Sequence, residues 1–436
     1  MTEQADRRSI VFVTIDSLRA DYCGFSGHDR ELTPTLDSFA EDGTVFENAV
    51  APGPSTSESV PAIVTGDYPV EREEAAVDID QRISRIKPHL QARRTIAERL
   101  SEIGYETAAF TPNPFTSRYF GYDDGFDHFE DFLDGSRDQI YQRLLKGMKG
   151  SDYYLPVRIL LNWTQREEAF KPWEAFYDDI IEWADNQNDP YFIWVFLMDV
   201  HHPYLSDRET RSQSILKEYF ANWELRRKQY DLDPESRTHD WLVQSYEDSI
   251  RYMDKCLDQL ATDLDDDNPV FVVTGDHGEA FGEHDSYEHH GGAFGQEGEQ
   301  EYHSFLYEEN IHVPLVLGNY DGVDSIEDPV SLSAIPDILE SVATDQDITE
   351  VADDFAFSKT MDDDKIAVRG RRYKSITTLD SIKVYDLDRG ETDPIENDKL
   401  SDEFGSFVAG VRNTTEEQGR LSSWSRQFST KSEEQG

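Results

Sequence analysis

Residues 9–16 read SIVFVTID, and this stretch decides the fold class. Its β-branched and aromatic residues form an almost unbroken apolar run, which is typical of a strand covered on both faces in a parallel sheet. Asp16 comes directly after the run, where open α/β sheets bind ligands outside the carboxyl ends of their strands. Asp16 is therefore a candidate site residue, with a helix N-cap for the next segment as the alternative interpretation.

Helical and strand patterns alternate along the rest of the chain. Residues 33–43 carry the signals of a helix, and residues 96–110 combine an amphipathic helix with a short strand. Two further buried-strand patterns follow, YFIWVFLM at 191–198 and VFVVT at 270–274. The alternation predicts an α/β fold with a doubly wound, mostly parallel sheet flanked by helices.

The sequence also predicts how the chain is divided. Residues 1–350 are expected to form the main α/β domain, with a helical insertion at about 126–188. Residues 351–412 include two strand patterns beyond Ala367 and are expected to form a small C-terminal antiparallel α+β unit. The polar stretch 413–436 is expected to be a flexible tail.

Polar residues follow the two later strands as well. Asp276 and His277 follow residues 270–274 after one glycine, Gly275, and are followed by Gly278; glycines on both sides let backbone approach a ligand. An Asp-His pair at the carboxyl end of a parallel strand is what a metal site there requires. His201 and His202 follow residues 191–198, and for either histidine alone a structural role is an equal alternative.

Residues 56–66, TSESVPAIVTG, resemble a hydroxyl-rich turn that enters a helix. Such a turn presents a side-chain oxygen beside the free N–H groups of a helix start, where phosphate or sulfate is favoured. The alternative is that its hydroxyl groups serve only as N-cap and turn residues, namely Ser55, Thr56, Ser57 and Ser59.

The charge of the chain limits its partners. It contains 90 Asp+Glu against 41 Lys+Arg, a net charge of −49, and the acidic residues are dispersed over its 436 residues. Such a field repels nucleic acid and anionic membranes, and dispersed acidity of this size is expected of a halophile with a salt-saturated cytoplasm. The longest apolar run, 191–198, is shorter than the ~18–20 residues that span a bilayer, so we expect a cytoplasmic protein without a membrane segment.

In order along the chain, several blocks resemble those of the sulfatase family within the alkaline phosphatase superfamily. They cover most of residues 10–397 and are TIDSLRADYCG, LTPTLDSFAEDGTVFENAVA, TSESVPAIVTG, MDVHHPY, VFVVTGDHGE, LYEENIHVPLVL, VSLSAIPDIL, RRYKSI and VYDLDRGETDPIEND. The resemblance implies a metal-dependent hydrolase of ester bonds. By position it implies that Asp16, Asp276 and His277 bind metal, and that Thr56 is the nucleophile and also touches the metal.

The resemblance extends to the substrate-binding histidines. His201 occupies the position of a substrate-binding His in the H-x-P-Y block, and His303 lies where many members have a Lys. Both are expected to stabilise charge on the transferred group, and one of them to protonate the leaving group. Arg19 is a further candidate substrate contact, with a surface ion pair as the alternative.

The departures from the family motif bear on the reaction. Sulfatases carry Cys or Ser within C/S-x-P-x-R and convert it to an aldehyde hydrate, whereas Thr56 cannot be converted, and Glu58 and Val60 replace the Pro and Arg. Asp276-His277 replaces the usual Asp-Asn. This pattern is similar to phosphoester-cleaving relatives such as nucleotide pyrophosphatase/phosphodiesterases and lipoteichoic acid synthases, which use an unmodified Thr.

The sequence therefore predicts hydrolysis of phosphate or sulfate esters through Thr56, with phosphoesters favoured. The substrate is expected to be a small molecule or a glycan or lipid-headgroup ester. The alternatives are an arylsulfatase-type sulfate ester hydrolase and a non-catalytic binding protein with the same fold. A ligand set with an imidazole favours Mn²⁺ or Zn²⁺ over Ca²⁺ or Mg²⁺ as the divalent metal ion.

Overall fold

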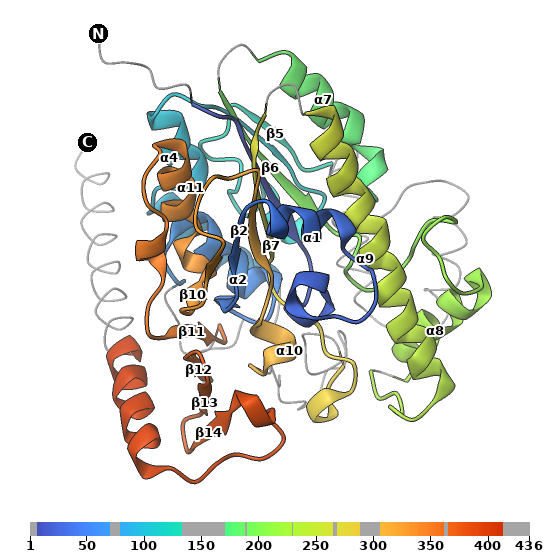
Figure 1. Cartoon of the computed structure of the whole chain (residues 1–436), viewed down its shortest axis with the longest axis vertical. Coiled ribbons are helices and arrows are strands. Elements are labelled where there is room, and N and C mark those ends of the chain that lie inside the picture. The colour runs from blue at the N-terminus through green and yellow to red at the C-terminus, as the bar shows by residue number, and fades with distance from the viewer. Residues whose placement is uncertain are drawn as a thin grey trace.

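A computed structural model describes residues 7–69, 79–132, 171–187, 190–228, 230–264, 268–287, 306–361 and 365–412. Its centre is an eight-stranded sheet (Figure 1). In spatial order the strands are β5 (His128–Glu130), β4 (Glu106–Phe110), β6 (Tyr191–Leu197), β1 (Ile10–Ile15), β7 (Val270–Gly275), β8 (Leu315–Gly318), β2 (Thr44–Phe46) and β9 (Ser325–Ile326). Within this sheet β8 alone runs antiparallel to its neighbours.

The central strand β1 shows why the unbroken apolar run forms a buried parallel strand. It pairs in parallel with β6 on one side and with β7 on the other. Alternate side chains point to opposite faces, so Phe12 enters one core layer and Val13 enters the other. All six residues of β1 are buried, which confirms the predicted two-sided coverage.

Helices cover both faces of the sheet, as the doubly wound prediction requires (Figure 1). One layer contains α2 (Thr56–Thr65), α3 (Ile79–Gln91), α4 (Ile96–Glu102) and α11 (Ile335–Ala343). The opposite layer contains α1 (Pro34–Glu41), α7 (Tyr177–Asp185), α8 (Ile215–Arg227) and α9 (Arg237–Asp263). The short helix α10 (Glu308–Ile311) precedes β8. None of the helices in the described residues is long and apolar enough to cross a membrane.

The C-terminal unit is a four-stranded antiparallel sheet, which confirms the second part of the fold prediction. Its strands are β11 (Ala356–Lys359), β12 (Ile366–Arg369), β13 (Tyr373–Thr377) and β14 (Ile382–Asp386), and residues 398–412 are helical. One face packs on this helix through Phe404 and Val408. The other face contributes Ala367 and Ile376 to the core of the main sheet. The unit therefore shares apolar surface with the α/β domain.

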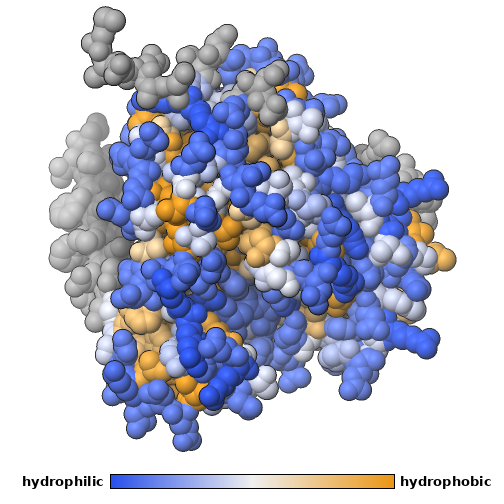
Figure 2. Space-filling view, in the orientation of Figure 1, coloured by the Kyte–Doolittle hydropathy of each residue, from blue (hydrophilic) through white to orange (hydrophobic). Residues whose placement is uncertain are grey.

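The division of the chain at residue 350 stays a prediction. Within the predicted insertion at 126–188, residues 128–130 form β5 of the main sheet and residues 177–185 form α7, whereas 133–170 and 188–189 lie outside the described residues. The predicted tail, 413–436, lies outside them as well. The face of the molecule in Figure 2 is mainly hydrophilic, in keeping with a chain in which charged residues make up 30%.

A cluster of charged side chains joins α10 to the C-terminal sheet. Lys374 is fully buried, and its Nζ lies 3.0 Å from Glu308 Oε1 and 2.9 Å from Glu391 Oε1. The Arg369 Nε lies 2.9 Å from Glu308 Oε2. Burial alone would raise the pKa of Glu308, but the two cations outweigh it and hold that pKa well below its usual range.

Replacing Glu308 by Gln is expected to lower the free energy of unfolding at pH 7 by about 2–4 kcal/mol. Breaking a buried ion pair typically costs about 3–5 kcal/mol, and Lys374 retains Glu391 here. Because the folded-state pKa of Glu308 is lowered, its stabilisation is complete above about pH 4.3, the ordinary Glu pKa, and disappears as the pH falls further. The difference between the wild type and Glu308→Gln should therefore shrink in acid, which urea unfolding at several pH values measures.

The control is Glu327→Gln, which removes a carboxylate from Arg371 in an exposed pair. That substitution should change stability by no more than about 1 kcal/mol. Equal losses in the two variants would contradict the assigned role of Glu308.

Candidate active site

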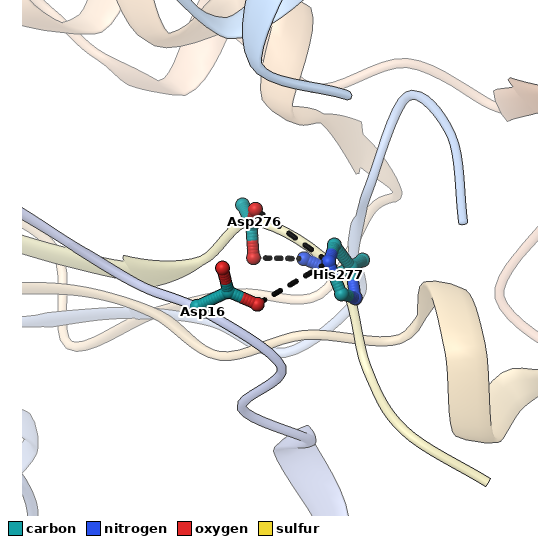
Figure 3. A group of neighbouring side chains, drawn as sticks. All are labelled: Asp16, Asp276 and His277. Atoms are coloured by element: carbon teal, nitrogen blue, oxygen red, sulfur yellow. Dashed lines mark hydrogen bonds and ion pairs between the residues drawn. The ribbon is translucent and has the colours of Figure 1, made fainter. Parts of the chain in front are cut away.

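The carboxyl ends of β1 and β7 bring three predicted metal ligands together. Ile15 and Gly275 are partners in the parallel pairing of the two strands, so the next residues, Asp16 and Asp276, emerge side by side. His277 Nε2 lies 3.5 Å from Asp16 Oδ1 and 3.7 Å from Asp276 Oδ2 (Figure 3). All three side chains are fully buried. A cluster of two carboxylates and an imidazole thus forms at the strand ends.

Thr56 joins this cluster from the N-terminus of α2. Its Oγ1 lies 3.4 Å from Asp16 Oδ2 and 3.4 Å from His277 Nε2. Thr56 is the first residue of the helix, after the extended N-cap Ser55. A helix start leaves its first N–H groups without intrahelical acceptors and favours an anion there. The residue predicted as nucleophile therefore lies beside the predicted metal ligands and at a helix start, where an anion is favoured.

Glu58 holds the turn before α2 in place. Its Oε2 accepts a hydrogen bond from Ser55 Oγ at 2.8 Å, and its Oε1 accepts one from the backbone N–H of Met361 at 2.8 Å. The backbone N–H of Lys359 donates to Pro52 O in the same region at 2.9 Å. The end of the C-terminal strand β11 thus buttresses the turn that carries Thr56. Glu58, which replaces the Pro of the sulfatase motif, therefore has a structural role.

The electrostatics of the cluster suit a divalent cation. Asp16, Asp276 and His277 each offer a ligand atom, and these atoms lie within 4.8 Å of one another. Burial and the neighbouring charge of Asp16 raise the pKa of Asp276 well above its usual value. Asp276 Oδ2 is buried and accepts no hydrogen bond from the described residues, and no Lys or Arg in that part of the chain pairs with either carboxylate. The negative charge of the two aspartates is therefore not balanced by a Lys or Arg of the described residues, and a bound metal ion would balance it.

Comparison with known proteins identifies the family. Residues 8–325, well over half of the chain, match the model of the sulfatase family. The chain belongs to the sulfatase family. The same family was expected from the sequence blocks, and that prediction is confirmed.

A relative of known family agrees with this assignment over a short stretch of sequence. An arylsulfatase of Clostridium perfringens is 32% identical over 99 residues, which are 23% of this chain and 19% of that protein. The alignment thus spans about a fifth of the curated relative. Because so little of that protein is aligned, its activity carries over only as a proposal.

Several solved structures share the fold. The phosphonate monoester hydrolase of Agrobacterium radiobacter has a TM-score of 0.63 at 16% identity, with 94% of this chain and 96% of that chain covered. An alkaline phosphatase superfamily protein of Vibrio parahaemolyticus has a TM-score of 0.57 at 17% identity, with 94% and 89% covered. A protein in complex with its substrate D-glucosamine-2-N,6-O-disulfate has a TM-score of 0.65 at 14% identity, with 94% and 98% covered. At these identities the likeness shows the fold alone.

Asn113 is a member of the site that the motifs of this sulfatase-family chain did not reveal. Its Nδ2 donates a hydrogen bond to Asp16 Oδ2 at 2.9 Å, and its Oδ1 accepts one from the backbone N–H of Phe115 at 2.8 Å. Asn113 follows β4, as Asp16 follows β1. The rule that singled out Asp16, a polar residue directly after a buried strand, points to this strand end too, but Thr111 comes first after β4, so the rule alone does not single out Asn113.

Replacing Asn113 by Ala is expected to weaken Mn²⁺ binding by about 10- to 100-fold, because partners that orient a metal ligand typically contribute that much to affinity. Isothermal titration of the metal-stripped protein with Mn²⁺ measures the change. Asn222→Ala, which removes a buried amide from α8 that hydrogen-bonds Tyr204, serves as the control. A metal affinity that falls equally in both variants would contradict a specific role for Asn113.

The structure places the remaining predicted residues as follows. His201 lies after β6, and its Nδ1 lies 2.6 Å from His202 O, which assigns the ring proton to Nδ1 when the ring is neutral. The Arg19 guanidinium pairs with Asp21 at 2.7 Å and Glu283 at 2.8 Å, the kind of contact that the alternative interpretation anticipated, although Arg19 is buried. Its role toward substrate stays a prediction. His303 lies outside the described residues.

Glu279 is a second residue that the prediction of site residues left out. It follows His277 by two positions and is fully buried. Burial raises its pKa to about 7, against the opposing charges of His201 and His277. This carboxyl therefore links the metal-ligand loop electrostatically to the predicted substrate histidine. No simple spacing rule separates it from the many other glutamates of this acidic chain.

Proposed function

We propose that this sulfatase-family hydrolase cleaves phosphate esters, with Thr56 as the nucleophile. The observation that supports the proposal is the position of Thr56 Oγ1, 3.4 Å from both Asp16 Oδ2 and His277 Nε2 at the N-terminus of α2. An unmodified hydroxyl is a poor nucleophile and needs activation by its surroundings. Thr56 cannot be converted to the aldehyde hydrate that sulfatases use. This favours a phosphate ester over a sulfate ester as the substrate.

In the proposed reaction, Thr56 Oγ1 passes its proton to Asp16 Oδ2, the acceptor of its hydrogen bond, and forms a bond to phosphorus while the bond from phosphorus to the leaving oxygen breaks. His201, or His303, donates a proton to that oxygen, and the backbone N–H groups at the start of α2 stabilise the transferred group. Water then gives a proton to the same histidine and attacks phosphorus, the bond from phosphorus to Thr56 Oγ1 breaks, and Thr56 recovers its proton from Asp16. A divalent ion held by Asp16, Asp276 and His277, with Mn²⁺ or Zn²⁺ favoured, would lower the pKa of the Thr56 hydroxyl and polarise the phosphoryl oxygens.

The second candidate is a sulfate ester hydrolase. It is favoured by the family itself and by the local likeness to an arylsulfatase. One structural neighbour was solved with a disulfated glucosamine and another with a neocarrahexaose, so a glycan ester is a reasonable substrate class for this chain too. Lipid-headgroup esters and small-molecule esters are the remaining substrate classes. A non-catalytic binding protein would hydrolyse none of these esters.

The test is a side-by-side assay of an aryl phosphate monoester, a phosphate diester and an aryl sulfate with Mn²⁺ in molar KCl, since the net charge predicts a salt-adapted protein. Phosphoester turnover with a phosphoryl group trapped on the Thr56 peptide after an acid quench is the expected result. Faster turnover of the sulfate ester would favour the second candidate. Metal binding without turnover of any ester would favour the binding protein.

A further inference from the structure

Within the part of the chain that the structure describes, Arg82 in α3 is a buried cation without an anionic partner. The residue is 8% exposed, in a chain where acids outnumber bases by 90 to 41. Its Nη1 donates a hydrogen bond to the neutral hydroxyl of Ser57 at 2.5 Å, and its guanidinium lies 5.5 Å from the centre of the Phe115 ring. No carboxylate of the described residues forms an ion pair with it.

Burial of an unpaired guanidinium is costly, so the missing partner needs an explanation. A guanidinium carries five N–H donors in a planar fork and stays charged at any physiological pH. Other buried arginines of this chain do have carboxylate partners: Arg19 pairs with Asp21, and Arg369 pairs with Glu308. A buried charge without compensation costs several kcal/mol in general, about the size of a protein's whole stability margin. The exception at Arg82 is therefore best explained by an anion that binds there from solution.

The position of Arg82 indicates which anion this is. Its hydrogen-bond partner, Ser57, is the residue after Thr56 and lies in the first turn of α2. Phe115, under the guanidinium, donates its backbone N–H to Asn113, whose side chain reaches Asp16. Arg82 therefore lies directly beside the nucleophile turn. A guanidinium and a helix N-terminus both favour the planar or tetrahedral oxyanions of phosphate and sulfate.

We propose that Arg82, the Ser57 hydroxyl and the first N–H groups of α2 form an oxyanion subsite beside Thr56. The subsite holds a non-bridging oxygen of the transferred phosphoryl or sulfuryl group, and afterwards the inorganic anion that is released. This inference rests on the proposed function for its location at Thr56, but binding of the anion needs no catalytic step.

The experiment measures binding of inorganic phosphate, and separately of sulfate, to the Mn²⁺-loaded full chain by isothermal titration. Arg82→Gln should weaken binding of the preferred anion by about 10- to 100-fold, the usual worth of a charge-assisted hydrogen bond. Arg82→Lys, which keeps the charge, should lose less affinity than Arg82→Gln. The anion with the stronger Arg82 dependence identifies the group that the subsite takes.

Arg93→Gln is the matched control, because it removes one positive charge from an arginine near the end of α3 that already pairs with Asp67 at 2.9 Å. It should leave anion affinity unchanged. Thermal melts distinguish binding from scaffolding: without anion, Arg82→Gln should melt at or above the wild-type temperature, and phosphate should no longer raise it.

Three results would overturn the inference. One is unchanged phosphate and sulfate affinity in Arg82→Gln, and another is the absence of anion binding in the wild type. The third is a large loss of stability in both Arg82→Gln and Arg82→Lys with the wild-type shift by phosphate retained. Hydrolysis that persists in Thr56→Ala would instead contradict the proposed function while leaving the anion measurements valid.

Discussion

Replacing Thr56 by Ala is expected to reduce phosphoester hydrolysis by about 10³- to 10⁶-fold, the range seen when the nucleophile of a catalytic unit is removed. The neighbouring hydroxyls cannot substitute readily, because Ser55 donates to Glu58 and Ser57 accepts from Arg82. The affinity for inorganic phosphate should change far less than turnover, since Arg82 and the helix start remain. Steady-state kinetics and the titration of the same preparation measure the two quantities.

Two variants control for this loss. Thr56→Ser keeps a hydroxyl at the same place and should retain measurable turnover with the same trapped intermediate. Ser59→Ala removes a buried hydroxyl one turn further along α2 and should leave turnover within about threefold of the wild type, because it lies in the helix interior. Activity that survives in Thr56→Ala but is lost in Ser55→Ala would move the nucleophile by one residue.

The sequence predicted the parts of the site that depend on strand ends. Asp16 and Asp276 follow unbroken apolar runs, and a parallel sheet brings the ends of neighbouring strands to one edge. The pattern of residues 56–66 likewise predicted a hydroxyl at a helix start, and α2 begins at Thr56. In each case a local sequence pattern fixes the position of a residue within its strand or helix. The parallel sheet then brings the ends of neighbouring strands together. These parts of the site could therefore be predicted from the sequence.

The missed residues depend on contacts between distant segments. Asn113 matters because β4 lies in the same sheet as β1, so that its amide reaches Asp16. Glu58 bonds to Met361 across more than 300 residues of chain, and Arg82 reaches α2 from α3. Asparagine, glutamate and arginine on helices and loops are usually solvated, so their types alone carry little information. Their roles emerge only when packing shows what they contact and whether their charge is compensated.

The C-terminal unit illustrates the same limit at a larger scale. Its strand patterns predicted an antiparallel sheet, and β11 to β14 form one. The sequence did not show that Ala367 and Ile376 join the main core, or that the backbone after Lys359 supports the Thr56 turn through Glu58. One face of that sheet packs on the main core and the other on the helix at 398–412. The alternation of side chains along a strand shows that there are two faces, but it does not show which partner covers each of them.

Removing the metal is expected to abolish turnover and to lower the melting temperature of the wild type. Two buried carboxylates without a Lys or Arg partner among the described residues repel each other in the metal-free protein, and Asp276 already has a pKa raised by burial and by Asp16. At a free metal concentration of 100 Kd, bound metal stabilises the folded state by about 2.7 kcal/mol. Scanning fluorimetry in EDTA and then in Mn²⁺, Zn²⁺, Ca²⁺ or Mg²⁺ measures the shift and ranks the metals.

The variant Asp276→Asn separates the charge effect from ordinary damage to the core. It removes one of the two buried charges, so in EDTA it should melt at or above the wild-type temperature, yet it should lose the stabilisation by metal and the turnover. Asp254→Asn is the matched control, because this buried carboxylate also accepts two backbone N–H groups, from Thr35 and Leu36 at the start of α1, but uses both of its oxygens for them and lies outside the metal-ligand cluster. It should lower stability by about 1–2 kcal/mol with and without metal alike. An Asp276→Asn protein that melts well below the wild type in EDTA and still responds to Mn²⁺ would show that this aspartate serves the fold, and the metal site would then have to be sought elsewhere.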